Sequence, residues 1–176
     1  MTTPVHPISA SHLLDHANRL LKKDGDPEGP KHADLRRVVS SAYYAVFHRL
    51  TLHVAHSVLP DTDDASRYAF CRLLAHGEFT TAFKRLLQKP ASVPENLREL
   101  ASLARTSDHV VNAARLFVRL QWERHDADYD HKSMFNRSRA LDAVDMATHA
   151  IDDLDRVPYD DPAWQAFVGL LLRKAK

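Results

Sequence analysis

Residues 124–131, with the sequence RHDADYDH, bring together side chains that phosphoryl chemistry uses. One arginine, two histidines, three aspartates and a tyrosine follow directly after the apolar, helix-patterned segment 110–122. Arginine stays charged and binds phosphate in a forked geometry, and histidine exchanges protons near neutral pH. The run is therefore a candidate site for phosphate binding and proton transfer. The alternative is an ordinary helix end followed by a solvated acidic turn.

The helical pattern directs Arg124 toward the apolar side of its helix. On a wheel of 100° per residue, Arg124 falls between Phe117 and Leu120. A buried arginine costs several kcal/mol unless it is paired. We therefore expect a definite partner for it, which is Asp126, Asp128 or a bound phosphate.

A second polar set follows one side of the helix expected over residues 34–59. Its core face is apolar, and a stripe of hydrogen-bonding side chains lies nearly opposite, at steps of three and four residues. The stripe consists of Arg37, Ser41, Tyr44 and His48. It forms either a wall of the site or a set of amphipathic side chains that pack against another helix.

Helices must position these residues, because the apolar pattern is helical almost throughout. Glycine is scarce, at 4 residues, and no run of alternating β-branched residues predicts a strand. We predict one all-α domain over residues 1–176, a bundle of four to five main helices with short connecting helices. Main helices are expected at residues 9–23, 34–59, 94–125 and 133–157, with a break near Thr106 and Ser107 in the third. A further helix from Pro162 docks onto the bundle, within residues 158–176.

Residues 60–94 are predicted to be a variable connecting region of short elements. One short helix is expected over residues 65–75, where His76 and Gly77 stop it, and another over residues 78–88. Residues 89–94 contain two prolines that cannot both lie in a helix interior, so they form a loop.

The third long helix has an apolar arc wider than half its circumference. Such a helix either lies in the middle of a large core or faces a partner chain on one side. For a chain of 176 residues the second alternative is favoured, which predicts a homodimer.

Composition limits the classes of function. The net charge is +1 with histidine neutral, so no global basic field draws the chain onto nucleic acid, and any such contact must be local. No apolar stretch reaches membrane-spanning length, and the N-terminal residues lack the basic and apolar parts of a signal peptide. We therefore expect a cytoplasmic protein that makes no membrane contact.

A metal hydrolase is the weakest interpretation of residues 124–131. Its candidate ligands would be His125, Asp126, Asp128, Asp130 and His131. These side chains crowd into one turn without a distant partner to close a coordination shell. We therefore expect neither a metal nor a cofactor.

Two stretches resemble the higher eukaryotes and prokaryotes nucleotide-binding (HEPN) superfamily, in particular its small stand-alone prokaryotic members. Residues 35–50, LRRVVSSAYYAVFHRL, are similar to the family's early helix, with its arginine, small residues and paired tyrosines. Residues 124–131 resemble the signature of its ribonucleases, an arginine followed after four to six residues by a histidine, and the Ala-Asp-Tyr run of an uncharacterised branch.

The resemblance implies a metal-independent endoribonuclease of toxin or phage-defence type that leaves 2′,3′-cyclic phosphate ends. In such enzymes the arginine and histidine of two chains meet in one cleft. Carried over, Arg124 holds the phosphate and His131 is the general acid or base, with His125 as a competing imidazole. The supporting or substrate-binding residues would be His125, Asp126, Asp128, Tyr129, Arg37, Tyr44 and His48.

The resemblance also implies partners, which are RNA and an antitoxin or nucleotidyltransferase that holds the enzyme inactive. Where a nucleotidyltransferase modifies family members, the tyrosine follows the histidine by two positions, whereas Tyr129 precedes His131 by two. The alternative function is a non-catalytic HEPN-like module that binds a nucleotide or protein, in which Arg124 only ties helices together.

Overall fold

The computed structural model of the chain describes residues 9–22 and 29–173, and all regular secondary structure in these ranges is helical. This confirms the all-α prediction. The elements in order are α1 (Ala10–Lys22), α2 (His32–Val58), α3 (Asp64–Cys71), α4 (His76–Leu87), η1 (Pro90–Ser92), η2 (Glu95–Leu97), α5 (Arg98–Ala104), α6 (Asp108–Tyr129), α7 (Arg137–Asp155) and α8 (Pro162–Leu172). Lys23, where we expected the first helix to end, lies outside the described residues, as do residues 174–176.

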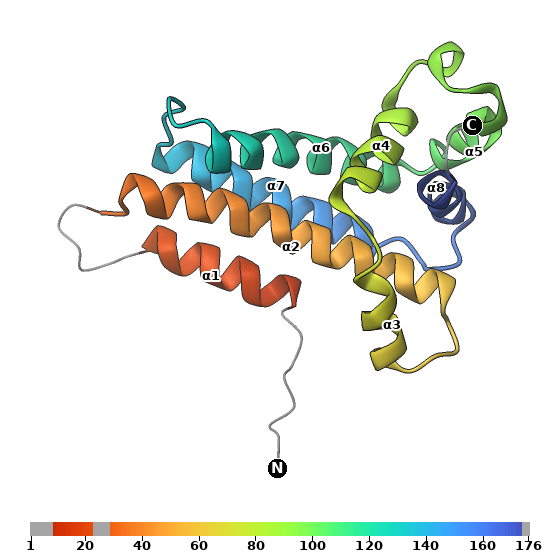
Figure 1. Cartoon of the computed structure of the whole chain (residues 1–176), viewed down its shortest axis with the longest axis horizontal. Helices are drawn as coiled ribbons and strands as arrows, with labels where there is room; N and C mark the ends of the chain where they lie inside the picture. The colour runs from red at the N-terminus through yellow and green to blue at the C-terminus, as the bar shows by residue number, and fades with distance from the viewer. Residues whose placement is uncertain (1–8, 23–28, 174–176) are drawn as a thin grey trace.

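Four helices lie lengthwise beside one another, and three others gather at one end. The lengthwise set is α1, α2, α6 and α7, whereas α4, α5 and α8 cluster near the C-terminal end of the chain (Figure 1). Helix α2 is central, since it contacts α1, α3, α6 and α7. The largest fully buried side chains come from both sets and include Tyr43, Phe79, Phe83, Phe117, Trp164 and Phe167. The two sets therefore share one apolar core.

The third long helix breaks where the sequence predicted. Helix α5 ends at Ala104, and the Ser107 hydroxyl accepts a hydrogen bond from the backbone N–H of Val110 at 3.4 Å to begin α6. Serine is a favoured residue at this position because its oxygen satisfies a donor that the helix start leaves open. The predicted break near Thr106 and Ser107 is confirmed.

Several predicted boundaries were wrong. Helix α3 ends at Cys71 instead of residue 75, and α7 begins at Arg137 instead of residue 133. Two further differences concern the site. His76 is the first residue of α4 instead of the stop of the preceding helix, and the Glu78 carboxylate accepts from the backbone N–H of Ala75 at 3.0 Å to cap it. Helix α6 continues to Tyr129, past the end predicted near His125. Both differences matter for the site, because they fix the positions of His76 and of the last turn of α6.

The chain's own helices cover part of the wide apolar arc of α6. Its inward residues are buried in contact with α2, α4 and α7. Val111, Leu116 and Val118 of the same arc are only partly buried, so the alternative of a partner chain on that side stays in place. The homodimer therefore stays a prediction.

Arg36 joins the first turns of α2 to the turn that follows α6. Its guanidinium donates to the carbonyl oxygens of Asp126 at 3.3 Å, Ala127 at 2.8 Å, Asp130 at 2.7 Å and Ser133 at 2.8 Å. Carbonyl groups at a helix C-terminus lack partners within the helix. One side chain therefore caps α6 and shapes the α6–α7 turn.

We predict that Arg36→Ala lowers the free energy of unfolding by about 2 to 3 kcal/mol, because it leaves several carbonyl groups without a donor. The neighbouring Arg37 is exposed, so Arg37→Ala should change the free energy of unfolding by less than about 0.5 kcal/mol. Urea unfolding followed by circular dichroism measures both. Equal effects of the two substitutions would contradict this role of Arg36.

Candidate functional site

Arg124 lies where the last turns of α6 meet the middle of α2. Its side chain is 23% exposed, Nη2 donates to the Tyr44 hydroxyl at 3.0 Å, and Nε lies 2.7 Å from Asp128 Oδ2. The contact with Asp128 is an ion pair without the alignment of a hydrogen bond. The guanidinium also lies over the ring of Tyr129, with 5.3 Å to its centroid. The prediction of a definite partner is confirmed, and Asp128 is that partner.

Asp128 connects this cluster to α2 a second time. The hydroxyl of Ser40 donates to Asp128 Oδ1 at 2.6 Å, while Oδ2 faces Arg124. Asp126 points elsewhere, because its carboxylate accepts from Arg139 of α7 at 2.9 Å. Of the two candidate acids, one therefore holds Arg124 and the other fastens α6 to α7.

Of three other predicted site residues, one contacts the edge of this cluster and two lie away from it. His125 is exposed and its ring contacts that of Tyr129, with 5.2 Å between centroids. His131 is exposed in the α6–α7 turn, and no contact among the described residues joins it to Arg124. Arg37 is exposed on α2. The last two lie outside the Arg124 cluster within one chain.

The imidazole that lies near Arg124 belongs to His76, which sequence reasoning treated as a helix stop. Its ring stacks on Phe47, with 3.6 Å between centroids, and contacts the rings of Tyr43 and Tyr44 at 5.5 and 5.4 Å. Its Nδ1 is 2.9 Å from the Tyr43 hydroxyl. The capping carboxylate three positions after Ala75 is the signal that could have located this helix start.

His76 and His48 both line a groove of about 820 Å³. Burial lowers the pKa of His48 from its ordinary 6.5. Burial, with smaller contributions from Arg124 and His48, also lowers the pKa of His76. Burial raises the pKa of Tyr43, so its hydroxyl keeps its proton. The groove thus presents two imidazoles that are neutral at pH 7.

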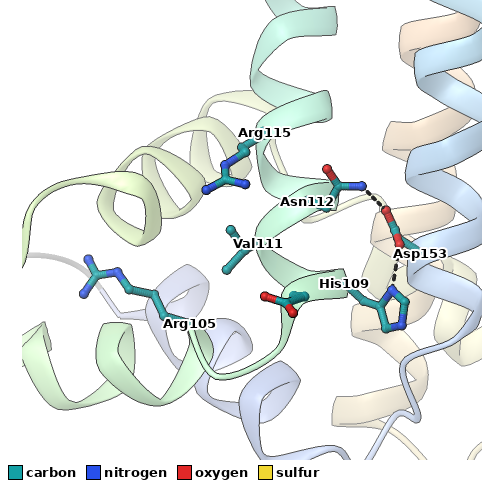
Figure 2. Close-up of a pocket in the computed structure, with 7 residues that line it drawn as sticks. Arg105, His109, Val111, Asn112, Arg115 and Asp153 are labelled. Atoms are coloured by element: carbon teal, nitrogen blue, oxygen red, sulfur yellow. Dashed lines mark hydrogen bonds and ion pairs between the residues drawn. The ribbon is translucent and has the colours of Figure 1, made fainter.

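A second, open pocket of about 570 Å³ surrounds the first turns of α6. Asp153 of α7 is buried there, with His109 Nδ1 at 2.7 Å and a hydrogen bond from Asn112. Figure 2 shows Arg105 and Arg115 extending to the other side of α6 from these groups. Arg105 also donates to the carbonyls at the end of α4. These contacts fasten helices, and they do not converge on one ligand position.

No protein-family model, curated protein or solved structure matches the chain. Within residues 9–22 and 29–173, no three histidine, cysteine, aspartate or glutamate side chains are placed to hold a metal ion together. None of the helices described there has the length and apolar character needed to cross a membrane.

The site therefore combines a fixed cation with neutral imidazoles. Arg124 can bind a phosphate oxygen, since a guanidinium carries five donors and its ion pair and hydrogen bond occupy Nε and Nη2. An imidazole near its working pH can accept or donate a proton. This chemistry requires no metal ion.

We predict that His76 titrates below pH 6.5 in the folded protein and that Arg124→Leu moves its midpoint upward, because a nearby positive charge is removed. Side-chain nuclear magnetic resonance across a pH series measures the midpoint. Arg119→Leu is the matched control, since Arg119 is an exposed arginine of the same helix. A His76 midpoint that Arg124→Leu leaves unchanged would show that the two groups do not interact.

Proposed function

We propose that this protein is a metal-independent endoribonuclease of HEPN type, in which Arg124 binds the scissile phosphate. The observation that carries the proposal is the half-buried guanidinium of Arg124, held by Asp128 and Tyr44 near the imidazole of His76. The lengthwise packing of α1, α2, α6 and α7 is consistent with a HEPN-like bundle of four to five main helices.

RNA can be cleaved with these groups alone. The 2′-hydroxyl attacks the adjacent phosphorus, and the 5′ oxygen leaves, which yields a 2′,3′-cyclic phosphate and a 5′-hydroxyl. An imidazole assists the proton transfers, and a guanidinium stabilises the extra negative charge on the phosphoryl oxygens. A fixed donor of this kind contributes about 10²–10³-fold to the rate in other enzymes.

The proposal includes a homodimer, cytoplasmic action of toxin or phage-defence type, and an antitoxin or nucleotidyltransferase as partner. His131 is the imidazole that the family resemblance assigns to proton transfer. Because it is exposed in the α6–α7 turn, it is accessible to the Arg124 cluster of a second copy.

Purified protein incubated with total RNA in a metal chelator tests the function. We expect wild type to cleave and leave 2′,3′-cyclic phosphate ends, and Arg124→Ala to reduce the rate by about 10²–10³-fold. The exposed Arg119 offers a matched control, so Arg119→Ala should stay within about twofold of wild type. Both variants must show the wild-type circular dichroism spectrum.

Absence of cleavage by folded wild-type protein, freed of any bound partner, would overturn the nuclease. Cleavage by wild type and Arg124→Ala at equal rates would instead remove Arg124 from the mechanism. Both cleavage rates are compared with that of the same RNA incubated without protein, so the two results are distinguishable.

A second candidate function is a non-catalytic module that binds a nucleotide or a protein. The favouring observation is that Arg124 and Asp128 each contact α2, through Tyr44 and Ser40, and so fasten α6 to it. If this is their role, Arg124→Ala destabilises the fold. Lower unfolding stability of that variant, together with inactive wild type, would favour this function.

A further inference from the structure

The proposed reaction requires one group that accepts the 2′-hydroxyl proton and another that protonates the 5′ oxygen. From the groove geometry we infer that His76 is the general base and His48 the general acid, and that the groove binds single-stranded RNA. This inference rests on the proposed function. It assigns to the groove the role that the family resemblance gives to His131.

The position of His131 within one chain argues for this assignment. Arg36 holds the α6–α7 turn from the first turns of α2, whereas Phe47 stacks on His76. With 1.5 Å of rise per residue, positions 36 and 47 are roughly 16 Å apart along α2. The turn and the groove therefore lie at separate places along the helix, and His76 is within electrostatic range of Arg124.

The surroundings of His76 fit a general base. Its ring stacks on Phe47 and is hydrogen-bonded to the Tyr43 hydroxyl, so its orientation is fixed. The hydroxyl of Tyr43 lies 2.9 Å from Nδ1 and its oxygen can accept from Nδ1–H, which leaves the lone pair on Nε2. The same hydrogen bond persists after Nε2 takes a proton. Burial, with a smaller contribution from Arg124, lowers the pKa of His76 and so favours the neutral imidazole before the reaction.

His48 is placed to serve as the acid. It lines the same groove as His76 and lies close enough to affect its protonation. The charged or titratable groups around this pair come from four elements. They are Arg124 of α6, Tyr43, Tyr44 and Arg49 of α2, Tyr68, Cys71 and Arg72 at α3, and Asp155 of α7, which is ion-paired with Arg49. Because proton uptake by one imidazole opposes uptake by the other, the two protons bind in separate steps, and the singly protonated pair forms as the pH falls below 6.5.

The groove also fits an unpaired nucleotide. Its volume of about 820 Å³ falls in the range of ligand pockets, and its walls include the rings of Phe47 and Tyr68 and the guanidinium of Arg72. Aromatic rings stack on unpaired bases, and exposed arginines contact backbone phosphates. Phe47 is buried against His76, so Tyr68 is the ring that a base can reach, and only after it has left a duplex, which selects single-stranded RNA.

The step balances without a metal, an oxidant or a water molecule. Nε2 of His76 takes the 2′-hydroxyl proton, the 2′ oxygen bonds to phosphorus, and the bond from phosphorus to the 5′ oxygen breaks. The imidazolium of His48 gives its proton to the departing oxygen. Arg124 does not line the groove but contacts the same two tyrosines as His76, and in this assignment it binds the phosphoryl oxygens from beside the groove. Solvent then restores both imidazoles.

The test compares His76→Gln, His48→Gln and the control His149→Gln on a single-stranded and a duplex RNA in chelator. His149 is an exposed histidine of α7. We expect each groove substitution to reduce single-strand cleavage by about 10²–10⁴-fold, and the control to match wild type. Binding of a 2′-O-methyl RNA of the same sequence, which cannot react, should persist in the folded variants. The wild-type rate should peak below pH 6.5, because burial lowers the pKa of both groups.

The variant Tyr43→Phe separates a direct effect on His76 from a loss of folding, because its expected effect is a shift in the pH of maximal rate. It removes the hydroxyl partner of His76 Nδ1, so it should shift the pH of maximal rate while RNA binding remains. Wild-type rates in both His48→Gln and His76→Gln, with loss in His131→Gln, would overturn the inference and leave the nuclease intact. Inactive wild type would overturn the nuclease and this inference together.

Discussion

The charge of Arg124 is the constraint on which the site depends. A guanidinium that is 23% exposed needs compensation for the water that it loses, and Asp128 and Tyr44 supply it. Both contacts fix how α6 lies against α2. That contact places the paired tyrosines beside the first turn of α4, where Tyr43 meets Nδ1 of His76. Pairing one buried charge thereby organises the site.

Sequence reasoning found the features that depend on neighbours along the chain. Helical periodicity predicted an all-α protein and directed Arg124 toward the apolar side of its helix. A break near Thr106 and Ser107 was also predicted, and Ser107 caps the start of α6 there. Asp128, four residues after Arg124, lies one turn away on the same helix face, and it was one of the three predicted partners, with Asp126 and a bound phosphate. Each of these follows from local spacing.

Features that depend on distant parts of the chain were missed. The carbonyls of Asp126 and Ala127 are capped by Arg36, about ninety positions away, so the local pattern ended the helix too early. The role of His76 depends on rings from α2, and Ala75 is a poor cap, so the α4 start looked like a stop. The packing of α4 against α6 could likewise not be predicted from the sequence of α6 alone.

The most direct test of phosphate binding by Arg124 is a nuclear magnetic resonance titration with an unreactive 2′-O-methyl RNA oligonucleotide. The account predicts that the side-chain signals of Arg124, His48 and His76 shift together at one affinity, while that of His109, in the other pocket, stays in place. Shifts confined to His109 and Arg115, or none at Arg124 with saturating RNA, would contradict it.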